Sequence, residues 1–93
     1  MKNEKETLKL KVHGHVQGVG FRNACKRHAH LHGVQGWVSN AQDGTVDVVL
    51  QGNPDQVDRM LSWLGQGPAG AQVAEIEQEI LYTGIFYDRF EIR

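Results

Sequence analysis

A short glycine-containing turn between an alternating apolar stretch and a helical stretch is the feature that most constrains the fold. It is the run Gly14-His15-Val16-Gln17-Gly18-Val19-Gly20-Phe21-Arg22. Glycine tolerates positive φ angles, so successive backbone N–H groups in such a turn can converge on one point. The start of the following helix adds unpaired N–H donors, and Arg22 adds a planar, permanently charged fork that matches phosphate oxygens. The turn is therefore a candidate cradle for a small dianion such as phosphate.

The spacing within this turn excludes two widespread phosphate-binding loops. A dinucleotide fingerprint running from Gly18 would need glycine or alanine at position 23, where the chain has Asn23. A Walker A loop would need Gly-Lys followed by serine or threonine, and the chain contains no such triplet. Taken alone, the turn is equally compatible with a plain strand-to-helix connection in which the glycines serve only the backbone geometry.

Periodicity predicts the elements on either side of the turn. Apolar and polar residues alternate over 8–16, as in a strand with one solvated face. The helix after the turn carries a weakly apolar stripe and ends at Gly33, a natural C-cap. Residues 34–41 and 45–51 are two further strands, and the Asp43-Gly44 pair between them indicates a hairpin.

The second half of the chain repeats the pattern of helix and strand. Asn53 and Pro54 form an N-cap followed by proline at the first helical position, and glycines near 65–67 end that helix. Residues 71–81 form a further strand with a possible bulge, and Thr83-Gly84 is an expected turn before a short strand around Phe90 and Ile92.

This order of elements predicts a ferredoxin-like sandwich of the α+β class. It is the β-α-β-β-α-β pattern plus a short C-terminal strand, with two helices on one face of an antiparallel sheet. We expect a single domain over residues 1–93, with the charged residues 1–7 as a frayed N-terminal tail. The fold hosts many unrelated functions and does not decide the activity.

Composition excludes several classes of function. The net charge of −1 argues against a dedicated nucleic-acid binder, which usually carries a basic face. No apolar run approaches the about 20 residues that a membrane span needs. A single cysteine, Cys25, rules out an intramolecular disulfide and fits a reducing compartment, so we expect a cytoplasmic protein. His28 and His32 lie four residues apart, but no carboxylate or cysteine completes a known metal-ligand spacing.

Two motifs together resemble the acylphosphatase family. Residues 14–22 match the family pattern Gly-x-Val-Gln-Gly-Val-Gly-Phe-Arg throughout. Residues 36–44 match a second pattern, Gly-aromatic-Val-x-Asn followed by Asp-Gly. The likeness extends from about Leu10 to Ile92 without obvious gaps, so it is far more specific than one glycine turn.

The resemblance implies hydrolysis of a small-molecule acyl phosphate to a carboxylate and inorganic phosphate by a cytoplasmic monomer. It implies that Arg22 and the backbone of the loop bind the phosphoryl group and that Asn40 orients the attacking water. The loop comprises Gln17, Gly18, Val19, Gly20, Phe21 and Arg22. The family works without a metal or cofactor, and it implies neither a nucleic acid nor a membrane as partner.

Three other functions remain as alternatives. The turn could be the anion site of a binding module without catalysis. An RNA-recognition sandwich shares the fold, but the strand with stacking aromatic residues that it requires is missing from the sequence. An effector-binding regulatory domain would usually be fused to an enzyme or dimeric.

Overall fold

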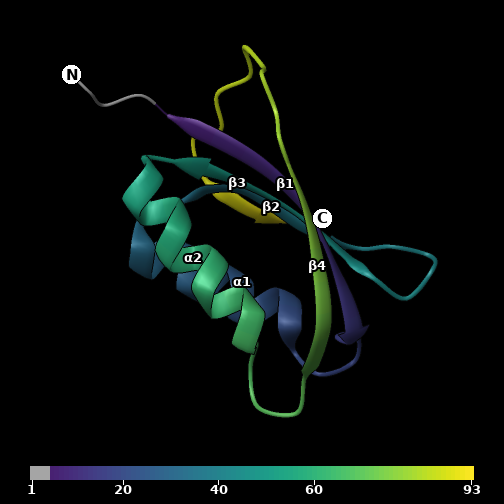
Figure 1. The fold of residues 1–93 in the computed structure, drawn as a ribbon. Coiled ribbons are helices and arrows are strands. Elements are labelled where there is room, and N and C mark those ends of the chain that lie inside the picture. The colour runs from purple at the N-terminus through teal and green to yellow at the C-terminus, as the bar shows by residue number, and fades with distance from the viewer. Residues whose placement is uncertain (1–4) are drawn as a thin grey trace.

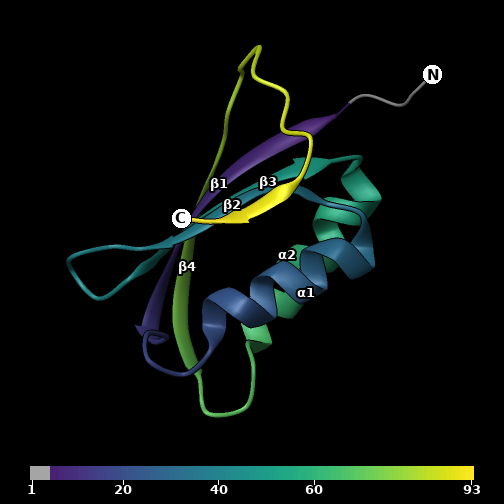
Figure 2. The same ribbon diagram turned by 180° about the vertical axis from the view of Figure 1, so that it is seen from behind.

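The computed structural model describes residues 5–93, in which two helices cover one face of a five-stranded sheet (Figures 1 and 2). The elements follow one another as β1(Glu6–His15), α1(Phe21–His32), β2(Gln35–Asn40), β3(Val46–Gly52), α2(Pro54–Gln66), β4(Gln72–Ile80) and β5(Phe90–Ile92). The predicted ferredoxin-like order of elements is confirmed, and each predicted strand and helix lies within a few residues of its expected position.

The predicted N-terminal tail is too long. Residues 1–4 lie outside the described part of the chain. Glu6 and Thr7 already belong to β1, where they pair with Gly52 and Gln51 of β3. Their charge and polarity suggested a solvated tail, but pairing with a neighbouring strand satisfies their backbone groups.

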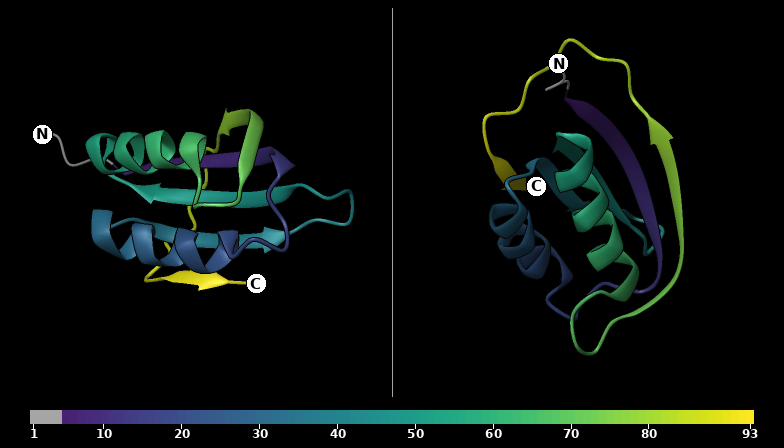
Figure 3. Two further views of the ribbon diagram at one scale, coloured as in Figure 1. Left: turned by 90° about the horizontal axis from the view of Figure 1, so that it is seen from below. Right: turned by 60° about the vertical axis from the view of Figure 1, so that its left-hand side comes forward.

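The sheet is mixed and not purely antiparallel as predicted. Its strand order is β4-β1-β3-β2-β5, and only β5 pairs with its neighbour β2 in parallel. The reason is the path of residues 81–89, which cross from the edge at β4 to the opposite edge (Figure 3, right). β4 ends at the end of the sheet where β2 begins, so a strand that enters there runs in the same direction as β2.

The crossing segment is anchored by one buried glutamine. Gln51 is only 2% exposed, and its amide donates to Thr7 Oγ1 at 3.0 Å and to the carbonyl of Ile85 at 2.8 Å. Its carbonyl accepts from the backbone N–H of Tyr87 at 2.9 Å. Residues 81–87 carry no regular secondary structure, and the Ile85 N–H donates to Thr83 Oγ1 at 3.1 Å across the Thr83-Gly84 pair, where the sequence predicts a turn.

The core lies between the helices and the sheet, as the alternation of residues in β1 predicts. Leu8, Leu10 and Val12 are buried, while the alternating side chains of Lys9 and Lys11 belong to the other face. α1 packs on β2 and β5, and α2 packs on β3 and β4. This division of the sheet places the N-terminus of α1 beside the C-terminal ends of β2 and β5 (Figure 2).

Both helices begin and end at residues that suit their positions. Asn53 accepts from the Gln56 N–H at 2.9 Å, and the Gln56 side chain accepts from the Asn53 N–H at 3.1 Å, so α2 starts with a capping box. α1 ends at Gly33 with φ 72°, and its backbone N–H bonds to the last turn. The N-cap of α1 is Gly20, whose lack of a side-chain bond leaves the first N–H groups of that helix free.

A histidine on α1 joins the two helices through an aromatic stack. The ring of His28 lies 4.1 Å from the ring of Trp63 at an interplanar angle of 15°. Its buried Nδ1 has no hydrogen-bond partner within the described residues. Burial, together with the positive charges of His32 and Arg27, lowers the pKa of His28 below its ordinary value.

We therefore expect His28 to make the stability of the fold depend on pH. Because its folded-state pKa is depressed, the stability that it contributes is present above its unfolded pKa of about 6.5. That contribution is lost as the pH falls through the lower folded-state value. His28→Phe keeps an aromatic ring on Trp63 and removes the titration, so the urea midpoint of the wild type should fall more between pH 7.5 and pH 5 than that of the variant. Parallel pH profiles for the two proteins would contradict this expectation.

Candidate functional site

The turn after β1 forms a short loop that wraps the start of α1. Gly18 and Gly20 both have φ 77°, a left-handed conformation that residues with a side chain rarely adopt. A Cβ atom at either position would meet nothing within 4 Å, so the backbone angle and not space favours glycine there. Within the described chain, the N–H groups of residues 18–20 donate to no other backbone group. The first backbone bond of α1 runs from Ala24 to Gly20, which leaves the N–H groups before it available as well.

A cavity of about 160 Å³ opens above this loop. Its lining consists of Val16, Gly18, Gly20, Phe21, Arg22, Asn23, Asn40 and Ile92. The volume suits a small anion, since pockets for drug-sized ligands usually measure about 300–1,000 Å³. None of the lining residues is acidic, so the charge of Arg22 is not opposed by a carboxylate in the lining.

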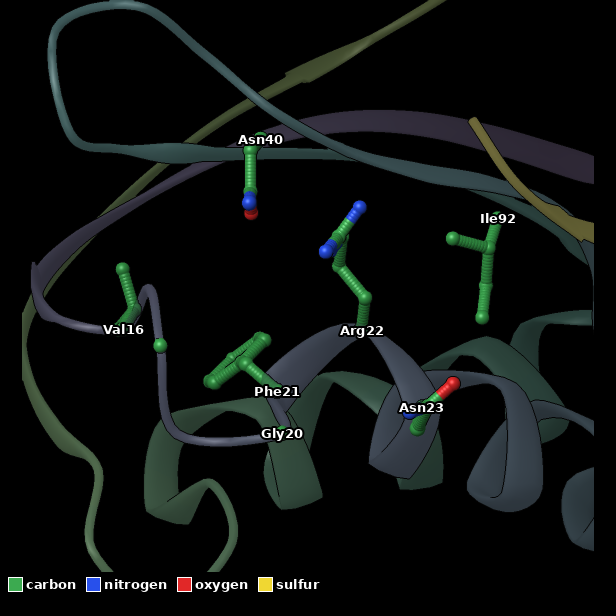
Figure 4. Close-up of a pocket in the computed structure, with 8 residues that line it drawn as sticks. Val16, Gly20, Phe21, Arg22, Asn23, Asn40 and Ile92 are labelled. Atoms are coloured by element: carbon green, nitrogen blue, oxygen red, sulfur yellow. The ribbon is translucent and has the colours of Figure 1, made fainter.

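Arg22 and Asn40 approach this cavity from different elements. Arg22 projects from the first turn of α1, and its guanidinium points toward the Asn40 side chain (Figure 4). Asn40 is the last residue of β2, and its amide points back toward the loop and Arg22 (Figure 4). Arg22 takes part in none of the ion pairs formed among residues 5–93. The guanidinium and the amide are therefore both free to contact a ligand in the cavity.

The side chain of Gln17 ties the two halves of the site together. Its Nε2 donates to the carbonyl of Ala41 at 2.8 Å and to the carbonyl of Thr45 at 2.9 Å. Ala41 directly follows Asn40, so this bridge fixes the loop relative to the end of β2. Gln17 is a predicted loop residue, and no local sequence pattern indicates that its side chain bonds to the neighbouring hairpin.

The hairpin that carries Asn40 is closed by a second set of polar contacts. Asp43 Oδ1 accepts from the backbone N–H of Thr45 at 3.1 Å and from its hydroxyl at 2.6 Å, and these bonds lower the pKa of Asp43. Lys11 donates to Thr45 Oγ1 at 3.2 Å and to Asp47 at 3.0 Å, and the bond to Asp47 raises the pKa of Lys11. The Asp43-Gly44 turn predicted from the sequence is therefore stabilised by the bonds of Asp43 and Lys11 to Thr45.

The predicted site residues do not all reach the cavity. Gly18, Gly20, Phe21, Arg22 and Asn40 line it. Gln17 acts at the hairpin, and Val19 packs against the hydrophobic core.

Three lining residues were not foreseen, namely Val16, Asn23 and Ile92. The first two adjoin the loop in sequence and could have been suspected on that ground. Ile92 arrives from the other end of the chain, and only the strand order brings it to this cavity.

The histidines and the cysteine show no arrangement typical of a metal site or a nucleophile. Among the described residues, no group of three or more histidine, cysteine or acidic side chains could hold a metal ion. Cys25 is fully buried on the inward face of α1, and burial raises the pKa of its thiol. A buried thiol with a raised pKa is a packing residue and a poor nucleophile.

Across residues 5–93, no helix has the length and apolar character that a membrane crossing requires.

The family model and several relatives that are similar in sequence name one family. The family model named Acylphosphatase matches residues 8–92. An acylphosphatase of Paraburkholderia xenovorans (strain LB400) is 54% identical over 86 residues, which cover 92% of this chain and 89% of that protein. One from Bordetella avium (strain 197N) is 57% identical over 72 residues, or 77% of each chain. The structure of an acylphosphatase from Coxiella burnetii matches with a TM-score of 0.91 at 32% identity, covering 98% of this chain and 94% of that one.

Proposed function

The chain belongs to the acylphosphatase family and is an acyl-phosphate hydrolase, and we propose that Arg22, Asn40 and the loop over residues 17–22 carry out the reaction. In this proposal the loop and Arg22 bind the phosphoryl group, and Asn40 holds the attacking water. The water oxygen forms a new bond to phosphorus, the bond from phosphorus to the carboxylate oxygen breaks, and the products are a carboxylate and inorganic phosphate.

The residues around the cavity suit the demands of phosphoryl transfer. The transition state is loose and in line, and its charge is spread over the equatorial phosphoryl oxygens. Catalysis then consists of holding the phosphate, neutralising charge and placing the water. Free N–H groups of the loop and the planar fork of Arg22 supply donors for the phosphoryl oxygens.

An acyl phosphate needs little acid–base help from the protein. Its leaving group is a carboxylate, which departs without first taking up a proton. The amide of Asn40 can accept a hydrogen bond from water and donate one at the same time, but it is a poor base. We therefore assign Asn40 the placement of the water, with the phosphoryl group as acceptor for its proton.

One observation carries the proposal, namely that Arg22 and Asn40 point from different elements into the same cavity, whose lining contains no acidic residue (Figure 4). The same loop in a plain strand-to-helix connection would have no reason to meet a free amide from the end of β2. The bridge from Gln17 to the hairpin holds these two parts in register.

Hydrolysis of benzoyl phosphate in EDTA tests this assignment. We expect turnover by the wild type and a loss of about 10²–10³-fold in kcat for both Arg22→Gln and Asn40→Ala, because each removes one well-placed group. Arg59→Gln is the matched control, since Arg59 is an exposed arginine of α2 that does not line the cavity.

Each other outcome of this assay has a definite meaning. A folded wild type without turnover, both with and without EDTA, would make the cavity an anion-binding site without catalysis. Wild-type rates in both variants would place the reaction elsewhere on the chain. Turnover in a parallel assay without EDTA, but none with it, would contradict the metal-independent reaction that we propose.

We propose further that the enzyme works as a monomer in the cytoplasm, as its resemblance to the family implies. Light scattering at the assay concentration should return the molar mass of one chain.

A further inference from the structure

The outward face of α1 carries an unusual concentration of positive charge. The helix contains Arg22, Lys26 and Arg27 and no acidic residue, although the chain as a whole has a net charge of −1. We call the stretch formed by Asn23, Lys26, Arg27 and His30 the basic face. These residues are exposed and lie opposite the buried side of the helix.

The basic face continues directly from the proposed active site. Its four residues are spaced three and four apart, which places them on one side of a helix. They line a shallow depression of about 320 Å³, and Asn23 lines both this depression and the cavity that contains Arg22 and Asn40. Lys26 follows Arg22 by one helical turn, a distance of about 6 Å along the axis.

Among residues 5–93, the positive charges of this face have no ion-pair partner. The ion pairs within residues 5–93 involve Lys11 and His13 on the sheet and Arg89 and Arg93 near β5. None of them involves Lys26 or Arg27. Cations four residues apart on a helix, such as Arg22 and Lys26, repel each other and lower its stability. An anionic ligand bound at this face would offset that repulsion.

We propose that the basic face is a second anion subsite, which selects acyl phosphates whose acyl part carries a further carboxylate or phosphate. The inference rests on the proposed function, because the first anion is the phosphoryl group held by Arg22 and the loop. An acyl chain that leaves the cavity past Asn23 brings its distal anion to Lys26 and Arg27. An acyl group of two to four carbons covers the one helical turn between these positions.

A pair of substrates of similar length isolates the second anion. Succinyl phosphate carries a distal carboxylate, and butyryl phosphate carries a methyl group in its place. The measurement is the ratio of kcat/KM for succinyl phosphate to kcat/KM for butyryl phosphate. Exposed ion pairs contribute about 0.2–1 kcal/mol, so Lys26→Gln and Arg27→Gln should each lower this ratio up to about fivefold. Lys26→Arg, which keeps the charge, should retain the wild-type ratio.

Further readouts separate this subsite from a general effect of charge. The loss should lie mainly in KM for succinyl phosphate, because Lys26 is remote from the breaking bond, and it should shrink as salt rises. Arg59→Gln removes an equal charge from α2 and should leave the ratio at the wild-type value.

Two results would overturn the inference. The first is turnover of both substrates with a ratio that Lys26→Gln and Arg27→Gln leave unchanged. The second is an equal fall of the ratio in Arg59→Gln, which would mean that only the overall field of the protein matters. A wild type that hydrolyses neither substrate would overturn the proposed function itself, and the two failures are therefore distinguishable.

Discussion

Replacing Arg22 with lysine should lower kcat by at least about 10²–10³-fold while the protein remains folded. Lysine keeps the positive charge but offers a compact ammonium in place of the planar fork, and it cannot bind two phosphoryl oxygens side by side. Arg22 is exposed and forms no ion pair with the described residues, so its role in stability should be small. A loss of activity would then report on the lost geometry of phosphate binding.

Arg22→Lys is best measured with benzoyl phosphate beside Arg59→Lys, which makes the same change at an exposed position of α2. Circular dichroism and the urea midpoint establish that both variants are folded. Near-normal kcat in Arg22→Lys would show that charge alone suffices and would contradict two-point binding of the phosphoryl group.

Gly36→Ala should strongly destabilise the sheet, with a loss of about 3–5 kcal/mol in the free energy of unfolding. Gly36 lies in β2 with φ 136°, a conformation that residues with a side chain rarely adopt. A Cβ atom there would lie 1.9 Å from the backbone oxygen of Val49 in β3. Neither β2 nor β3 can move aside without losing pairs of the sheet. Since domains are stable by only about 5–15 kcal/mol, much of the fold's stability depends on this one position.

Two other glycines serve as controls for this prediction in urea unfolding. Gly44 also has a positive φ of 92°, but a Cβ atom there meets nothing within 4 Å, so Gly44→Ala reports backbone strain alone. Gly65 lies in α2 with open space around it, and Gly65→Ala should stabilise the helix by up to about 1 kcal/mol. A loss in Gly36→Ala no larger than that in Gly44→Ala would contradict a steric role for Gly36.

Local patterns in the sequence predicted the elements well because local physics determines them. The alternation of apolar and polar residues predicted the buried face of β1, and Asn53 followed by Pro54 predicted the start of α2. The parallel pairing of β5 could not be predicted in this way, because strand order depends on contacts between distant segments. The anchoring of the crossing segment by Gln51 could not be predicted either, because it also joins residues that are far apart in the sequence.

The features of the candidate site also fall into two groups, those predicted from local sequence and those that depend on contacts between distant segments. Glycines at 18 and 20 and the position of Arg22 at a helix start follow from the sequence between β1 and α1. That Asn40 meets Arg22 follows from the sheet, and the sequence indicated it only through the resemblance of two motifs to one family. The hydrogen bonds of Gln17 to the hairpin and the place of Ile92 in the cavity lining could be recognised only from the three-dimensional structure.

The pairing of β1 has a consequence for the order in which the protein folds. Gly14 and His15, the last residues of β1 before the loop, pair with Val73 and Gln72 at the start of β4. The support for the loop therefore comes from a segment far along the chain, and closing so long a stretch is slower than forming a helix. A nascent chain whose β4 segment has not yet emerged from the ribosome lacks this support for the loop. Recovery of activity during refolding accordingly reports on the longest-range pairing in the sheet and follows the formation of α1 and α2.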